Sequence, residues 1–155
     1  MSVVVRQAEL EDWSEVKNLW FNLKDSPHAM KIEGDLGTLK AFFVGSLTSP
    51  HVCMWVSIEN GMYTGFVITQ INLTPEPTGN GQVVTIPLQF IRAVYVDNRI
   101  ADPGTVGIMD TVMCNHSREQ GCKAVFGHCR KDFPARAALK QYGYEPAYLV
   151  MRKEL

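Results

Sequence analysis

The sequence lacks an excess of charge of either sign and lacks any long apolar run. Its 155 residues include 15 lysines and arginines against 16 aspartates and glutamates, a formal charge of -1. This balance provides no global field that would attract nucleic acid or an anionic membrane. No stretch approaches the roughly 18 apolar residues that span a bilayer, and the first residues do not resemble a signal peptide. We therefore expect a soluble, cytoplasmic protein with no membrane contact and no strong nucleic-acid signal.

Cysteine is scarce, with four residues in the chain. A chain with 46% hydrophobic residues can build a core without disulfides, so we expect free thiols. Several potential metal ligands lie within sixteen positions: Cys114, His116, Cys122, His128 and Cys129. On a helix, however, residues two apart project about 200° from each other, and neighbours on a strand face opposite sides. Zinc needs converging ligands, so we expect no metal site, and a Cys/His nucleophile pair is equally disfavoured.

What the sequence does contain is the composition of one ordinary globular domain. Aromatic residues make up 10% and charged residues 20%, and the length is one at which single cores are common. We expect a single domain over residues 1–155.

Helical and strand patterns follow one another in a definite order. Asn60-Gly61 is typical of a two-residue hairpin turn, and it separates two segments rich in strand formers. Pro87 lies inside another apolar segment, where it predicts a bulge or a sheet edge. In chain order we predict a strand at Val3 to Val5, helices at Glu9 to Lys24 and about Leu36 to Leu47, strands at Val52 to Glu59, Met62 to Leu73 and Val83 to Asp97, a helix at Thr105 to Gln120, a strand at Lys123 to Cys129, a helix at Pro134 to Tyr142 and a strand at Tyr148 to Arg152.

This order predicts a mixed α/β fold in which an antiparallel meander is followed by a βαβ unit. We expect a central, mostly antiparallel sheet of six or seven strands with about four helices. Its only parallel neighbours should be Gln89 to Asp97 and Lys123 to Cys129, joined by the helix that begins near Thr105.

Several segments, taken in order, resemble the GNAT acetyltransferase superfamily along essentially the whole chain. They are Arg6-Gln7-Ala8 with Asp12-Trp13, then Val94-Tyr95-Val96-Asp97, then Arg118 to Lys123, then Tyr142-Gly143-Tyr144-Glu145-Pro146, and finally Met151 to Leu155. The resemblance implies transfer of an acyl group from acetyl-CoA to an amine, with the acyl-CoA between two strands that splay apart after the fourth. It also implies that Val94 and Val96 on the fourth strand contact the acyl-CoA.

In that family a glycine-rich loop at the start of the long helix binds the diphosphate, because free backbone N–H groups and the helix dipole attract anions there. The corresponding residues are Ala101, Asp102, Gly104, Thr105, Val106 and Gly107. Only Gly104 keeps the family pattern. The usual basic or amide residue is replaced by Ala101, and Asp102 adds a carboxylate that would repel a diphosphate.

Asp102-Pro103 has its own local interpretation, because Asp is a preferred N-cap and Pro is preferred at the first helical position. Asp102 would then bond the N–H groups near Gly104 and Thr105. An equally weighted alternative is a plain Pro-Gly turn with Asp102 facing solvent. In both cases the anion site is impaired.

The catalytic positions also depart from the family. The tyrosine that usually protonates the leaving thiolate aligns with Leu139, which leaves Tyr142, one turn later, as a displaced acid or a core residue. His128 is a candidate acid or base because its unperturbed pKa is near neutral, although a structural histidine is the commoner case. Tyr95 lies beside the expected splay, where it would bind an acceptor, orient a water or simply pack.

Two functions from different classes follow. The first is an acetyl-CoA-dependent N-acetyltransferase that acts by direct attack of a primary amine, on a small molecule or a protein. The second is a catalytically inert GNAT-fold module, for example a phage-type structural or host-interaction protein, that no longer binds acetyl-CoA. The sequence leaves open the acceptor, the oligomeric state and whether coenzyme A binds, and both a homodimer and a larger protein assembly are compatible with it.

Overall fold

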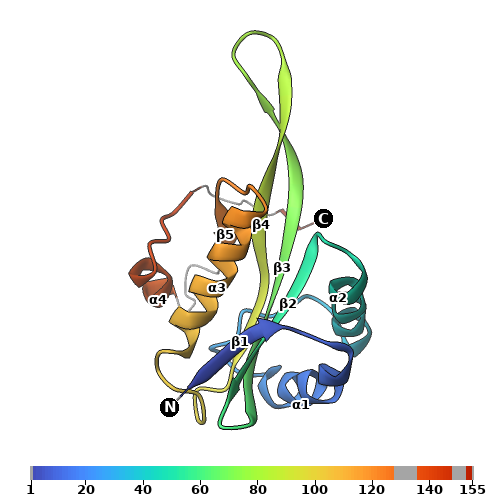
Figure 1. Ribbon diagram of the computed structural model, residues 1–155, viewed down its shortest axis with the longest axis vertical. Helices are drawn as coiled ribbons and strands as arrows, with labels where there is room; N and C mark the ends of the chain where they lie inside the picture. Colours follow the sequence, from blue (N-terminus) through green and yellow to red (C-terminus); the bar gives the residue numbers. More distant parts are fainter. Residues whose placement is uncertain (1, 128–135, 148–152, 155) are drawn as a thin grey trace.

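The computed structural model describes residues 2–127, 136–147 and 153–154, and its centre is one mixed sheet with the strand order β1-β2-β3-β4-β5 (Figure 1). Neighbouring strands are antiparallel from β1 to β4, and β4 pairs with β5 in parallel. The predicted fold class and the predicted parallel pair are therefore confirmed. The strands are β1 (Val3–Gln7), β2 (Val52–Glu59), β3 (Met62–Pro77), β4 (Val83–Val96) and β5 (Val125–Gly127).

The expected number of six or seven strands is not matched, since the described residues form five. The predicted closing strand, Tyr148 to Arg152, lies outside the described residues. Pro87 does not divide β4, because it pairs with Leu73 inside a continuous ladder. Among the described residues β5 pairs with Gln89 to Ile91, so within this part of the chain β4 is a sheet edge at Pro87, where the missing N–H removes no bond to β5.

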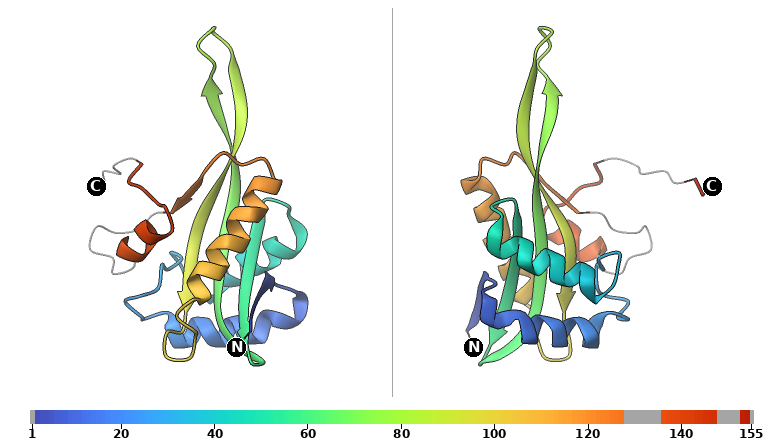
Figure 2. Two further views of the ribbon diagram at one scale, coloured as in Figure 1. Left: turned by 60° about the vertical axis from the view of Figure 1, so that its left-hand side comes forward. Right: turned by 90° about the vertical axis from the view of Figure 1, so that its right-hand side faces the viewer.

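Helices cover the two faces of the sheet unequally (Figure 2). α1 (Trp13–Leu23) and α2 (Leu36–Thr48) lie on one face, and α3 (Thr105–Glu119) lies on the other. We call these the α1/α2 face and the α3 face. α4 (Arg136–Gln141) follows β5 in the chain and lies near α3. Among the described residues, no helix has the length and apolar character needed to cross a membrane.

The periodicity seen in the sequence produces the core of the α1/α2 face. Val16, Leu39 and Phe43 are fully buried, as expected for a helical stripe that faces a sheet. They pack against residues of β2, β3 and β4 in one cluster that includes Met54, Val56, Phe66, Ile68, Ala93 and Tyr95. The predicted two-residue turn is also present, with positive φ at Asn60 (51°) and Gly61 (79°).

The hairpin of β3 and β4 continues well beyond the rest of the sheet (Figure 1). β2 pairs with β3 as far as Gln70, and β5 pairs with β4 from Gln89 onward. Residues 72–88 therefore form a two-stranded ribbon that pairs only with itself within the described chain. We call this segment the arm.

Candidate active site

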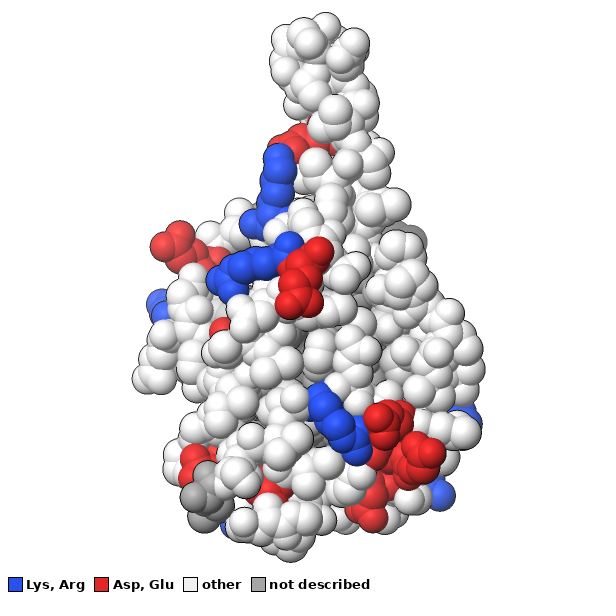
Figure 3. Space-filling model, viewed as in Figure 1, with Lys and Arg blue, Asp and Glu red and all other residues white. Residues whose placement is uncertain are grey.

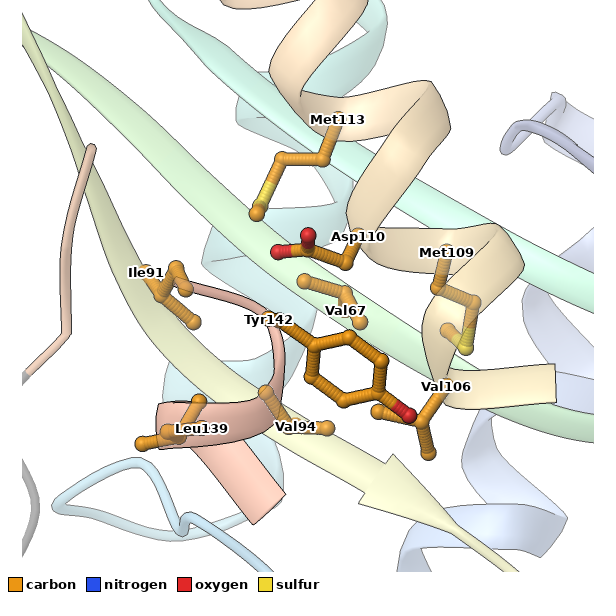
Figure 4. A pocket seen from close by; sticks show the side chains of 9 residues that line it. All are labelled: Val67, Ile91, Val94, Val106, Met109, Asp110, Met113, Leu139 and Tyr142. Atoms are coloured by element: carbon orange, nitrogen blue, oxygen red, sulfur yellow. The ribbon is translucent and has the colours of Figure 1, made fainter. Parts of the chain in front are cut away.

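A cavity of about 40 Å³ opens on the α3 face between β4, α3 and the turn after α4 (Figure 4). Its lining is apolar except for one carboxylate and one phenol. Among the described residues, β5 pairs with β4 up to Ile91, and the cavity lies beside the part of β4 that follows. The lining residues are Val67, Ile91, Val94, Val106, Met109, Asp110, Met113, Leu139 and Tyr142.

A glycine turn after α4 places two tyrosines against α3. Gly143 has a φ of 86°, which side-chain-bearing residues rarely adopt, and the N–H of Tyr144 bonds back to the Leu139 carbonyl at 3.1 Å. The reversal directs Tyr142 and Tyr144 toward residues three apart on α3, Gly107 and Asp110. The turn formed by the Tyr-Gly-Tyr sequence therefore closes one side of the cavity.

Tyr142 lies across the cavity, with its hydroxyl beside Val106 (Figure 4). Its ring packs so closely on Gly107 that a Cβ added there would lie 3.2 Å from Cε1 of the ring. A side chain at this position would require the ring to move away from the first turn of α3 by a few tenths of an ångström. The predicted site residues Tyr142 and Gly107 are thus brought together, with Gly107 supporting an aromatic side chain.

Asp110 points from α3 into the cavity and accepts a hydrogen bond from the Tyr144 hydroxyl at 2.7 Å (Figure 4). Cys114 lies one turn later, with its Sγ 3.8 Å from the same carboxylate oxygen. Burial, followed by the hydrogen bond to Asp110, raises the pKa of Tyr144 well above its usual value. Tyr144 therefore remains a donor at neutral pH and fixes the orientation of Asp110.

Two carboxylates occupy the start of α3. Asp102 Oδ1 accepts the Gly104 N–H at 2.8 Å, and Glu59 Oε1 accepts the Asp102 N–H at 2.7 Å. The helix begins at Thr105 with Gly104 as its N-cap, so the expectation that Asp102 is the N-cap and Pro103 the first helical residue is wrong by two positions. The shift arises because the Asp102 backbone carbonyl, rather than its side chain, accepts the Thr105 N–H at 3.0 Å.

The same region contains buried polar atoms without a partner among the described residues. Glu59 is 2% exposed and its Oε2 has no hydrogen bond, and Thr105 is fully buried with an unpartnered Oγ1. Such atoms are unusual in native proteins, where buried polar groups are nearly always paired. The start of α3 is therefore polar and negatively charged beneath its surface, which is unfavourable for an anion.

The structure brings together only some of the predicted binding residues. Val94 and Val106 line the cavity with Tyr142, and Leu139 lines it as expected for the position that aligned with the family tyrosine. The remaining predicted binding residues lie outside its lining: Val96, Ala101, Asp102, Gly104, Thr105 and Gly107, the last of which contacts the Tyr142 ring. The predicted residue His128 lies outside the described residues.

Tyr95 lies on the opposite face from the cavity. It is 1% exposed, stacks on Phe66 with ring centroids 4.8 Å apart, and its hydroxyl accepts the Ile32 N–H at 3.1 Å. Burial raises its pKa. The structure therefore gives Tyr95 the packing role, because its neighbour Val94, with the opposite orientation on β4, is the residue that reaches the cavity.

The segment between α1 and α2 pairs with β4 beside the cavity. Met30 and Val94 exchange two backbone hydrogen bonds, with N···O distances of 2.9 Å and 2.8 Å. The hydrogen bond from the Ile32 N–H to Tyr95 adds a third attachment. The outward N–H and C=O of Val94 are thereby used within the chain.

A thiol and an imidazole lie in contact on the α3 face, a pair that no spacing in the sequence predicts. Cys53 Sγ lies 3.4 Å from His116 Nε2, and His116 also makes an edge contact with Trp55. Burial raises the pKa of Cys53, which favours its neutral thiol form. Cys53, Cys114 and Cys122 are free thiols, and Cys129 lies outside the described residues.

Sequence reasoning missed Asp110, Tyr144 and Glu59. Asp110 could have been noticed, because it interrupts an otherwise apolar helical stripe that contains Val106 and Met113. Tyr144 follows the glycine that ends a helix, and the direction of its side chain depends on the geometry of that turn. No sequence pattern indicates the contact of Glu59 with Asp102, because the two residues lie 43 positions apart.

Comparison with solved structures shows which fold this is. A predicted acetyltransferase from Clostridium acetobutylicum, solved with acetyl-CoA, is 17% identical with a TM-score of 0.74, covering 97% of this chain and 96% of the other. An aminoglycoside N-acetyltransferase in complex with CoA is 15% identical with a TM-score of 0.77, covering 99% and 95%. Glucosamine-6-phosphate N-acetyltransferase from Arabidopsis thaliana is 15% identical with a TM-score of 0.70, covering 99% of both chains.

No protein-family profile matches the chain, and no curated protein matches it either. Another structure that is similar over all of both chains is a GNAT family acetyltransferase from Staphylococcus aureus, at 14% identity and a TM-score of 0.70. At such identities the likeness concerns the backbone and its topology. Together with the sheet order and the parallel β4 and β5 pair, it shows that the chain has the GNAT fold.

Proposed function

We propose that the chain is an N-acetyltransferase that transfers an acetyl group from acetyl-CoA to a primary amine. The observation that carries the proposal is the cavity bounded by α3 and by the part of β4 that follows Ile91, the last β4 residue paired with β5 among the described residues. Structures of this fold include complexes with acetyl-CoA and with CoA. The acceptor class, a small molecule or a protein side chain, is left open by the apolar cavity.

The described residues suit the acyl end of acetyl-CoA and disfavour binding of its diphosphate. Val94, Val106 and Met109 provide an apolar wall suited to an acyl group and the chain that follows it. At the start of α3 the Gly104 N–H is taken by the Asp102 carboxylate. A diphosphate would have to displace that carboxylate, so we expect binding to be weak and limited by this end.

Two side chains of the cavity are suited to move protons. A bound acetyl-CoA would supply a thioester whose carbonyl carbon is attacked by the amine while the C–S bond breaks. Tyr142 holds a proton at its hydroxyl oxygen inside the cavity and can give it to the leaving sulfur. Asp110, oriented by Tyr144, is the carboxylate in the described lining that can accept the proton lost by the amine.

An activity assay with acetyl-CoA and a panel of primary amines, followed by release of the free thiol, tests this proposal. Tyr142→Phe should lower kcat by about 100-fold with little change in KM, because general acid catalysis is worth about 10²–10⁴. Tyr95→Phe is the matched control, since it removes a hydroxyl on the other face of the sheet. A wild type that releases no thiol with any amine contradicts the proposal.

A second candidate function is favoured by the contacts at the start of α3 and on β4. Asp102 and Glu59 place two carboxylates where a diphosphate would bind, and Met30 uses the outward backbone groups of Val94. These contacts favour an inert module that keeps the fold as an assembly surface and does not bind acetyl-CoA.

Calorimetric titration with CoA separates the two functions. Asp102→Gly should raise the affinity for CoA by freeing the Gly104 N–H and removing a negative charge, and Asp102→Arg should raise it further. The matched control is Asp35→Gly, because Asp35 bonds the Thr38 N–H at the start of α2 on the other face, at 3.2 Å. Micromolar wild-type binding that neither Asp102 variant improves would contradict the inhibitory role of Asp102 and favour the enzyme.

A further inference from the structure

The segment between α1 and α2 lies along one edge of β4, beside the cavity (Figure 2). We call residues 28–34 the strap. Among the described residues, β3 occupies one edge of β4 as far as Val96, and β5 occupies the other edge at Gln89 to Ile91. The strap follows on that second edge, because Met30 pairs with Val94 through two backbone hydrogen bonds. The strap therefore takes the next position along the edge that β5 uses.

The side chain of Met30 reaches Gly127, the last residue of β5. Its Cε lies 3.8 Å from the position that a Cβ on Gly127 would have, and Cδ1 of Ile91 lies 3.6 Å from the same position. Met30 is buried in the apolar cluster that also contains Ile91 and Met109, with Val94 packed against it. The strap thus lies between Val94 of β4 and Gly127 of β5, in contact with residues that line the cavity.

Few attachments hold the strap against the sheet. Besides the two bonds with Val94, the Ile32 N–H donates to the Tyr95 hydroxyl at 3.1 Å. From Met30 onward, buried and exposed side chains alternate along the strap. Gly34, at its end, has a φ of 129°, which favours glycine where the strap turns into α2. A short segment with one bridge of main-chain pairing can detach locally while the rest of the sheet stays folded.

Surface charge gives little long-range guidance to an anionic ligand. On the face shown in Figure 3, lysine and arginine side chains lie among aspartates and glutamates, and the whole chain has a formal charge of -1. Salt screens such interspersed charges beyond about 8 Å at physiological ionic strength. The contacts at the cavity itself therefore decide whether a negatively charged acyl-CoA enters.

We propose that the strap is a reversible gate, which excludes acyl-CoA while it is paired with Val94 and admits acyl-CoA after it detaches; this inference rests on the proposed function. The chain that follows the thioester in acyl-CoA contains amide groups. An amide buried against β4 needs backbone partners, and the strap already uses those of Val94. Because strap and ligand compete for one edge, the apparent affinity for the ligand is reduced by the fraction of molecules whose strap is closed.

Hydrogen–deuterium exchange of the full chain, with and without CoA, tests the gate in the wild type. A bound ligand ordinarily slows the exchange of the amides that it covers. CoA should instead speed the exchange of the Met30 and Ile32 amides several-fold, because both lose their acceptors on β4 when the strap detaches. If CoA binds and the exchange of both amides is unchanged or slower, the gate is overturned and the proposed function stands.

Loosening the strap should raise the affinity for CoA. Met30→Ala removes the side chain beside β5, and Met30→Pro removes the N–H that bonds Val94. Each should lower the dissociation constant of CoA about tenfold in calorimetric titration, as expected for a gate that is mostly closed. Met54→Ala is the matched control, because Met54 is also buried but lies on β2, which β3 separates from β4. It should lower stability without raising the affinity.

The outcomes separate the gate from the proposed function. Folded Met30 variants that bind CoA no more tightly than the wild type overturn the gate, and so does a gain of equal size in Met54→Ala. If CoA opens the strap but no amine releases thiol from acetyl-CoA, the gate is supported and the proposed function is contradicted. If neither the wild type nor a folded Met30 variant binds CoA, both are overturned.

Discussion

The two faces of the sheet differ in how completely their buried groups are paired. On the α1/α2 side, the buried carboxylate of Asp12 accepts hydrogen bonds from Arg6, from the Glu9 N–H and from Tyr63. On the α3 face, Glu59, Gln89 and Thr105 are buried with polar atoms that have no partner among the described residues. The first face therefore supports the fold, whereas the second keeps a cavity and polar groups at the expense of stability.

Truncation of core side chains should show the largest contrast between the faces. Phe43→Ala on the α1/α2 face should lower the free energy of unfolding by about 4 kcal/mol, because the ring is fully buried in close packing. Met109→Ala should cost about 2 kcal/mol, since Met109 already adjoins the cavity and has fewer neighbours to lose. Urea unfolding measures both. Equal losses would contradict the contrast.

The pH dependence of stability should be carried by Asp12. The Arg6 guanidinium, through its hydrogen bonds, lowers the pKa of Asp12 to about 2. Its stabilisation is therefore complete above the unfolded pKa near 4 and is lost as the pH falls through about 2, a change of about 2 kcal/mol. Unfolding measured between pH 5 and 2 should show this loss in the wild type and in the control Asp25→Asn. Asp12→Asn should be less stable at neutral pH and should show a flatter profile.

Replacing an unpartnered polar group on the α3 face should stabilise the protein. Gln89 is fully buried, and neither amide atom has a hydrogen bond among the described residues. Gln89→Met keeps the volume and removes the desolvated amide, so the free energy of unfolding should rise by about 1 kcal/mol. Gln70→Met, on the partly exposed neighbouring strand, should change it little. A loss of stability in Gln89→Met would show that the amide has a partner.

The smallest contrast concerns the two aspartates at helix starts. Asp35 accepts an N–H of the first turn of α2, whereas Asp102 accepts the N–H of Gly104, which precedes α3. Asp35→Ala should therefore cost about 1 kcal/mol and Asp102→Ala a few tenths. Thermal unfolding of both variants at neutral pH measures the two losses of stability. A larger loss for Asp102→Ala would assign it a structural role as the principal cap of α3.

Local patterns predicted most of the fold, because they depend on residues close in the sequence. The helical stripe of Val16 and Trp20, the Asn60-Gly61 turn and the start of the long helix at Thr105 are all confirmed. The site was predicted less well. Whether a strand residue such as Tyr95 or Val94 faces the cavity depends on register, and a one-residue difference reverses the face.

Contacts between distant residues account for the rest. Glu59 reaches the Asp102 N–H, and Tyr144 reaches Asp110, only after the sheet and α3 have assembled. Neither pair has a spacing that a sequence pattern reveals. The resemblance of the chain to a known fold indicated where a site should lie, while the individual groups that occupy it became visible from the coordinates.

The register of β3 and β4 also has a consequence for the order of folding. Their ladder, from Gly65 with Val96 to Pro77 with Val83, closes through one short turn, so its contacts form at a small cost in chain entropy. The contact of β4 with β5 must wait until α3 is in place, because the chain between them is long. We expect the hairpin to form early and the cavity to be assembled last, so that unfolding begins at the candidate site while the hairpin is still intact.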